Sequence, residues 1–118
     1  MSYRLTRTAT AQVDDILVRS AAAERYALLL QFTFEAVGRD PTTPGGRPVP
    51  RLSGVFFFPT RLVGPRIPPR MKVGAPRHLI IYRIANDGMV EILGLAHDRM
   101  VLSRAAHRAM HGADGDTD

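Results

Sequence analysis

The chain of 118 residues is long enough for one domain with a genuine core. It contains no cysteine, which excludes disulfides, thiolate metal sites and cysteine nucleophiles. A formal net charge of +5, carried by 15 arginines and the single Lys72, and a pI near 10.7 favour an acidic partner, either nucleic acid or an acidic protein segment. The alternative for any single arginine is a solvated position on a basic surface.

Nothing in the sequence predicts export or a membrane span. No apolar run approaches the roughly 20 residues that cross a bilayer. Residues 1–12 have no apolar core of the kind found in signal peptides. With a mean hydropathy of −0.08, the chain is predicted to be soluble and cytoplasmic.

The first elements are predicted to be a short strand and two helices. Residues 3–5 form the strand candidate, and Thr6 or Thr8 can cap the helix that follows to residue 20. A second helix is expected over 22–37, with Gly38 as its C-cap and Asp40-Pro41 as its stop. Because almost no linker separates them, the helices should form an antiparallel hairpin.

The next region is rich in proline, with eight of the nine prolines in 41–69. Residues 54–58, which contain three consecutive phenylalanines, are a strand candidate that Pro59 ends. The basic segment 61–72 is either mobile or an arm that grips a partner.

The stretch 77–99 organises the chain. Its two apolar runs, 79–84 and 90–96, are predicted strands on either side of Asn86-Asp87-Gly88, a turn signal because Asn and Gly tolerate positive φ. A short C-terminal helix with a basic outer face should follow up to Met110.

Together these elements predict an α+β fold in the order β-α-α-β-β-β-α, a small antiparallel sheet with the helical hairpin on one face. We expect a single domain over 1–111, with a proline-rich loop region over 41–76. Residues 112–118 are acidic and glycine-rich, and are predicted to be a disordered tail.

The chain resembles the ParE/RelE family of type II toxin–antitoxin toxins over roughly residues 3–108. The residues that carry the resemblance are Arg77-His78 before an aliphatic run into Tyr82-Arg83, then the glycine turn, Val90-Glu91-Ile92 and His97-Asp98-Arg99-Met100. Tyr3-Arg4-Leu5-Thr6 running into Ala9, Val13 and Ile16 resembles the family's first strand and helix.

The HDRM segment at 97–100 and the basic C-terminal helix are closer to the ParE branch. That likeness implies a growth-regulating protein that binds DNA gyrase and traps its cleaved DNA complex without chemistry of its own. The cations expected to contact the target are Arg77, His97, Arg99 and Arg104.

The resemblance also implies a toxin–antitoxin hetero-oligomer. The cognate antitoxin would wrap the toxin with an acidic C-terminal segment, and its N-terminal half would bind operator DNA. We expect this segment to contact Tyr82, Arg83 and Arg61.

The alternative within the family is a RelE-like endonuclease that cuts ribosome-bound messenger RNA. Its chemistry needs cations for the phosphorane charge and a proton donor and acceptor. Lys72, Arg77 and Arg83 are the candidate cations, and His97 or Tyr82 the candidate acid or base. Against this role, Tyr82 can instead pack on the helical hairpin while His97 forms a hydrogen bond at the strand end.

A second alternative is a non-catalytic module that only binds nucleic acid. The basic composition favours it, but Phe56–Phe58 are contiguous, so neighbouring rings point to opposite faces of a strand. No P-loop, Rossmann, HExxH or GxSxG motif is present, and no cofactor is expected. His107 and His111 have the i, i+4 spacing of metal ligands but no third ligand nearby, so no metal site is predicted.

The sequence also departs from the resembled family. An acidic residue is expected where Gln12 stands, and a basic or polar one where Phe56 stands. The 41–69 region is longer than in short members, and such a loop beside the binding groove can redirect the toxin to another target.

Overall fold

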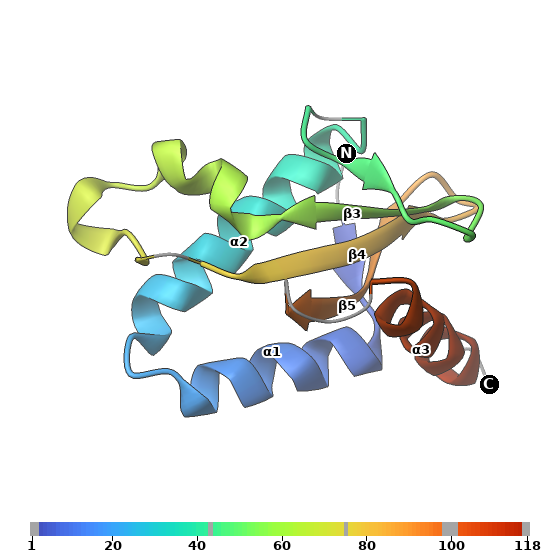
Figure 1. The fold of residues 1–118 in the computed structure, drawn as a ribbon, viewed down its shortest axis with the longest axis horizontal. Coiled ribbons are helices and arrows are strands. Elements are labelled where there is room, and N and C mark those ends of the chain that lie inside the picture. Colours follow the sequence, from blue (N-terminus) through green and yellow to red (C-terminus); the bar gives the residue numbers. More distant parts are fainter. Residues whose placement is uncertain (1–2, 43, 75, 98–101, 117–118) are drawn as a thin grey trace.

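A computed structural model describes residues 3–42, 44–74, 76–97 and 102–116, with side chains as far as residue 112 (Figure 1). The helices are α1 (Arg7–Arg19), α2 (Ala23–Arg39) and α3 (Leu102–Asp116). The strands are β1 (Tyr3–Leu5), β2 (Arg47–Pro48), β3 (Val55–Pro59), β4 (His78–Ile84) and β5 (Val90–His97). Two 3₁₀ helices, η1 (Thr60–Arg66) and η2 (Pro69–Met71), lie between β3 and β4.

The strands form one sheet in the order β1-β5-β4-β3-β2. β1 pairs in parallel with β5, and the other neighbours are antiparallel. The predicted α+β fold is thus confirmed, and the predicted antiparallel sheet is found with β1 as a parallel edge strand. The sequence did not predict β2, because two residues that include a proline give no strand signal.

The helical hairpin covers one face of the sheet, as predicted. Thr6 is the N-cap of α1, and its hydroxyl accepts a hydrogen bond from the Ala9 amide at 3.1 Å. The apolar stripe of α2 packs in the same cluster as Ile80, Tyr82 and Ile92 of the central strands. The prediction that Gly38 ends α2 was wrong: the helix continues to Arg39, and the Asp40 amide still bonds to the Ala36 carbonyl at 3.1 Å.

The opposite face of the sheet carries α3. Ala105, Ala106 and Ala109 form a second core cluster with Ile81 and Leu93. Small side chains let the helix lie close to the strands. Both faces of β5 are buried in this way, which explains its almost continuous apolar sequence.

The backbone of α3 is longer than predicted, because it is helical to Asp116. Residues 112–116, which were expected to belong to the acidic tail, continue the backbone of α3, and residues 117–118 lie outside the described residues. Gly112 explains part of the difference. A Cβ atom there would overlap the Thr8 side chain, so the glycine lets α3 approach α1 closely.

The basic segment 61–72 is attached to the core rather than extended from it. Val63 in η1 and Ile67 after it are both buried in the cluster formed with α2. The Thr60 hydroxyl donates to the His78 carbonyl at 2.8 Å and ties the start of η1 to β4. The arginines of the segment are exposed on this anchored base.

Within the described residues, no helix combines the length and the apolar character needed to traverse a bilayer.

Candidate functional site

One end of the central strands carries a pair of histidines. His78 begins β4 and His97 ends β5, and the register places them directly opposite each other. Their rings meet edge to face with centroids 5.7 Å apart. Both are partly buried, whereas Arg77 and Lys72, which precede them in the chain, are exposed.

Tyr26 of α2 completes this histidine end. Its hydroxyl is hydrogen-bonded to Nδ1 of His78, and the two rings are perpendicular. Burial raises the pKa of Tyr26 above its usual value of 10.0. Sequence reasoning named neither Tyr26 nor His78 as a site residue, because their contact joins α2 to β4 and no local motif reports it.

Tyr82 lies inside the core. Its side chain is 0% exposed, its ring stacks on Phe56, and its hydroxyl donates to the Pro41 carbonyl at 2.9 Å. Burial, with a smaller contribution from the charge of Asp40, raises the pKa of Tyr82 to about 12. A phenol in this position neither exchanges protons with an external substrate nor offers a surface to an antitoxin. The packing alternative considered for Tyr82 describes its place in the structure.

Arg83 faces the other side of the sheet and is engaged in an ion pair. Its guanidinium contacts Oε1 of Glu91 at 2.7–2.8 Å and the thioether sulfur of Met110 at 3.4 Å. Glu91 also pairs with Arg4 at 3.1 Å, and Arg4 bonds to Asp87 at 2.9 Å. The Met89 amide and Arg4 together lower the pKa of Asp87. Two arginines are therefore held by acidic partners at the hairpin end of the sheet.

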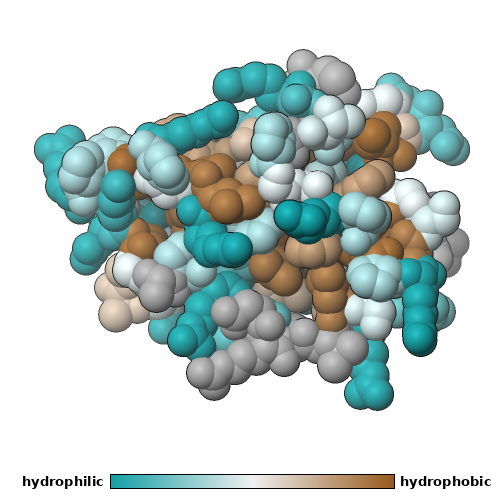
Figure 2. Space-filling model, turned by 45° about the horizontal axis from the view of Figure 1, so that its top comes forward, coloured by the Kyte–Doolittle hydropathy of each residue, from teal (hydrophilic) through white to brown (hydrophobic). Residues whose placement is uncertain are grey.

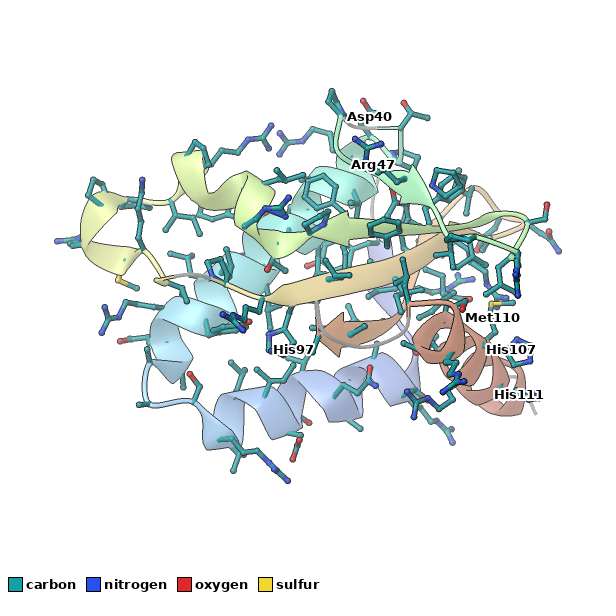
Figure 3. All side chains as sticks on the ribbon, viewed as in Figure 1. Asp40, Arg47, His97, His107, Met110 and His111 are labelled. Atoms are coloured by element: carbon teal, nitrogen blue, oxygen red, sulfur yellow. The ribbon has the colours of Figure 1, made fainter. Side chains whose placement is uncertain are left out.

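The structure does not bring the five candidate nuclease residues together. His97 ends β5, whereas Arg83 pairs with Glu91 close to the start of β5. Six residues of β strand span about 20 Å. Figure 3 shows His97 near the middle of the view, well separated from Met110, His107 and His111 on α3 at the right. Only Lys72, Arg77 and His97 stay candidates for a common surface.

A groove lies between the β2–β3 turn and the first turns of α3. It encloses about 830 Å³, and one wall is formed by Pro50, Arg51 and Leu52. The α3 wall is formed by Ser103, Arg104, His107 and Arg108. Figure 2 shows apolar side chains set among hydrophilic ones over the face that it presents.

Local structure fixes the turn wall of this groove. The Val49 amide bonds to the Val55 carbonyl at 2.8 Å and the Leu52 amide to the Val49 carbonyl at 3.2 Å, which closes a tight turn. Within the turn Arg51 has a φ of 68°, the single positive φ of a non-glycine residue in the described backbone. Val49 and Val55 are buried in the same cluster as the α3 alanines, so the turn and the helix share one core.

The cations expected to contact a target do not form one patch. Arg104 lies on the α3 wall of the groove. His97 lies at the histidine end, where Arg77 directly precedes its partner His78. Arg99 lies outside the described residues. Arg61, expected to contact an antitoxin, is exposed in η1 beside Leu62, which is 42% exposed.

His107 and His111 face each other on α3 with ring centroids 5.3 Å apart. Across the part of the chain that the structure describes, no group of three or more histidine or acidic residues is arranged to hold a metal ion.

The family model described as "ParE toxin of type II toxin-antitoxin system, parDE" matches residues 3–102, which run from β1 through β5 to the first residue of α3. No curated protein and no solved structure matches the chain.

Proposed function

The chain belongs to the ParE toxin family of type II toxin–antitoxin systems, and from this premise we propose that it binds and poisons DNA gyrase. The family implies a cognate antitoxin, and we propose that this partner neutralises the toxin in a hetero-oligomer. In this proposal the toxin traps gyrase with cleaved DNA and performs no covalent chemistry itself.

The observation that carries the proposal is the family match over residues 3–102. The scatter of the candidate nuclease residues supports a binding role over RNA cleavage. Of the two candidates for acid or base, Tyr82 is enclosed in the core. Arg83, a candidate cation, is already neutralised by Glu91.

For the target contact we propose Arg77 and His97 at the histidine end, with Arg99 and Arg104 as further cations. For the antitoxin contact we propose Arg61, because its exposed charge adjoins the exposed Leu62 and an amphipathic acidic segment needs both kinds of surface. Arg83 stays in the proposed antitoxin contact with a side chain that is 24% exposed and paired with Glu91. Tyr82, which is 0% exposed, is not part of this proposed contact.

The purified chain should be added in parallel to a gyrase supercoiling reaction and to a coupled translation reaction. We expect blocked supercoiling, accumulation of cleaved DNA in the gyrase complex, and unimpaired translation. His97→Ala and Arg77→Ala should each weaken poisoning, whereas Arg25→Ala, an exposed arginine at the start of α2, should not. Blocked translation with cut messenger and normal supercoiling would overturn the proposal in favour of a nuclease.

A further inference from the structure

We propose that the groove between the β2–β3 turn and α3 binds an acidic, amphipathic protein segment and that this segment covers Arg104. The identification of the segment with the antitoxin rests on the function proposed above, but the chemistry of the groove does not. This contact would be separate from the one proposed at Arg61, because η1 follows β3 whereas the turn precedes it.

The described residues that line the groove carry charge of one sign. They include Arg51, Arg104 and Arg108, and none of them is a carboxylate. None of the three arginines forms an ion pair with a described residue, in contrast to the paired Arg4, Arg19 and Arg83. A concave surface with only positive charge attracts and orients an acidic partner.

Two of these charges lie where folding does not favour them. Arg104 is in the first turn of α3, where the positive end of the helix dipole disfavours a cation. Arg51 adopts a left-handed backbone conformation, which costs a non-glycine residue free energy. Neither arrangement stabilises the fold, which supports a role for these charges in binding.

The apolar part of the groove lining favours a protein segment over nucleic acid as the partner. Pro50 and Leu52 offer surface that an apolar side chain covers favourably and a phosphate backbone does not. A segment with carboxylates on one side and leucine-like residues on the other matches both parts of the groove. We therefore favour a protein segment over nucleic acid.

The test uses the full chain and a fluorescent synthetic peptide whose glutamates and leucines occupy opposite faces of a helix. Binding is followed by fluorescence anisotropy. We expect Arg104→Glu and Arg108→Glu each to weaken binding on the order of tenfold. Rising salt should weaken binding of the unmodified chain and affect these variants less.

Arg25→Glu is the matched control. Arg25 is exposed and third in α2, as Arg104 is third in α3, so both substitutions change the net charge and the helix terminus alike. We expect Arg25→Glu to leave affinity within about twofold of the original. Equal weakening by Arg25→Glu and Arg104→Glu would mean that net charge alone drives binding, and would overturn the proposal.

The position of the bound peptide can be determined independently by protection of an introduced thiol, because the chain has no cysteine of its own. Ser103→Cys places a unique thiol on the groove wall, and Ala21→Cys places one at the exposed turn between α1 and α2. The peptide should slow alkylation of the thiol at 103 and not of the thiol at 21. Equal protection at both sites, or displacement of the peptide by a DNA duplex that itself protects position 103, would reject the groove as a peptide site.

The gyrase assay separates this proposal from the proposed function. If the peptide binds the groove but supercoiling is normal, the groove proposal holds and the target is wrong. If the chain poisons gyrase and the cognate antitoxin reverses poisoning by Arg108→Glu and by the unmodified chain equally well, the function holds and the groove proposal fails.

Discussion

The side chain of Gln12 on α1 supplies a hydrogen-bond acceptor to the Leu95 amide in β5, as a further neighbouring strand would. Its Oε1 accepts a hydrogen bond from the Leu95 amide at 2.8 Å. β1 ends opposite Ile92, so it does not extend to this part of β5. A carboxylate oxygen could accept the same hydrogen bond. Glutamine can therefore fill a position where an acidic residue was expected.

Gln12→Ala should destabilise the fold by about 1–3 kcal/mol, because it leaves the partly buried Leu95 amide without its acceptor. Gln12→Glu should keep most of the stability at neutral pH. Urea unfolding measures both changes. Gln31→Ala removes an exposed hydrogen bond to Glu35 on α2 and serves as the control with a small effect. Equal midpoints for Gln12→Ala and Gln31→Ala would contradict this account.

Gly94→Ala should destabilise the fold by about 1–3 kcal/mol through crowding. A Cβ there would lie 2.9 Å from Oε1 of Gln12 and 3.2 Å from the Cβ of Ala109, so it would press on α1 and α3 together. Gly64→Ala is the control, because a Cβ at Gly64 meets nothing within 4 Å. Thermal unfolding of both variants measures the difference. In the double variant Gln12→Ala, Gly94→Ala, the cost of Gly94→Ala should fall, and strict additivity would show that the two residues do not interact.

Glu91→Gln should cost about 1–3 kcal/mol, because Glu91 is 13% exposed and holds both Arg4 and Arg83. The exposed pair of Asp15 with Arg19 is the comparison, and Asp15→Asn should cost only about 0.3–0.5 kcal/mol. Unfolding at low and high salt distinguishes them, since the more buried pair is screened less. A cost for Glu91→Gln as small as that for Asp15→Asn would show that the network adds nothing to the fold.

Local signals in the sequence were sufficient for the hairpin and the helices. Asn86-Asp87-Gly88 predicted the β4–β5 turn, where Gly88 has a φ of 84°, and Thr6 predicted the start of α1. The signals failed where a property depends on residues far apart in the chain. The sequence predicts Arg83 as a candidate cation but does not predict its ion pair, because the partner Glu91 is fixed only by strand register.

The groove was missed for the same reason. Arg51 and Arg104 are far apart in sequence, and the core shared by Val49, Val55 and the α3 alanines is what brings their segments together. Arg51 stood in a proline-rich stretch that gave no strand signal, so the short pairing of β2 with β3 could not be foreseen. Periodicity did identify the basic outer face of α3, including Arg104, but not the turn that faces it.

The stability of the fold should fall between about pH 10 and pH 12 through the titration of Tyr82. Burial raises the pKa of this phenol from 10.0 to about 12 in the folded chain, so its contribution is fully present below pH 10 and is lost as pH rises through the folded pKa. The total loss should be on the order of 2 kcal/mol.

Tyr82→Phe removes this dependence on pH, and at neutral pH it should cost about 1 kcal/mol, because the Pro41 carbonyl loses its donor. Urea unfolding of both chains across this range is the measurement. Burial also raises the pKa of Tyr3 and Tyr26, which are present in both chains, so only the difference between the two curves reports Tyr82. Parallel curves would show that Tyr82 ionises as readily in the folded chain as in the unfolded one.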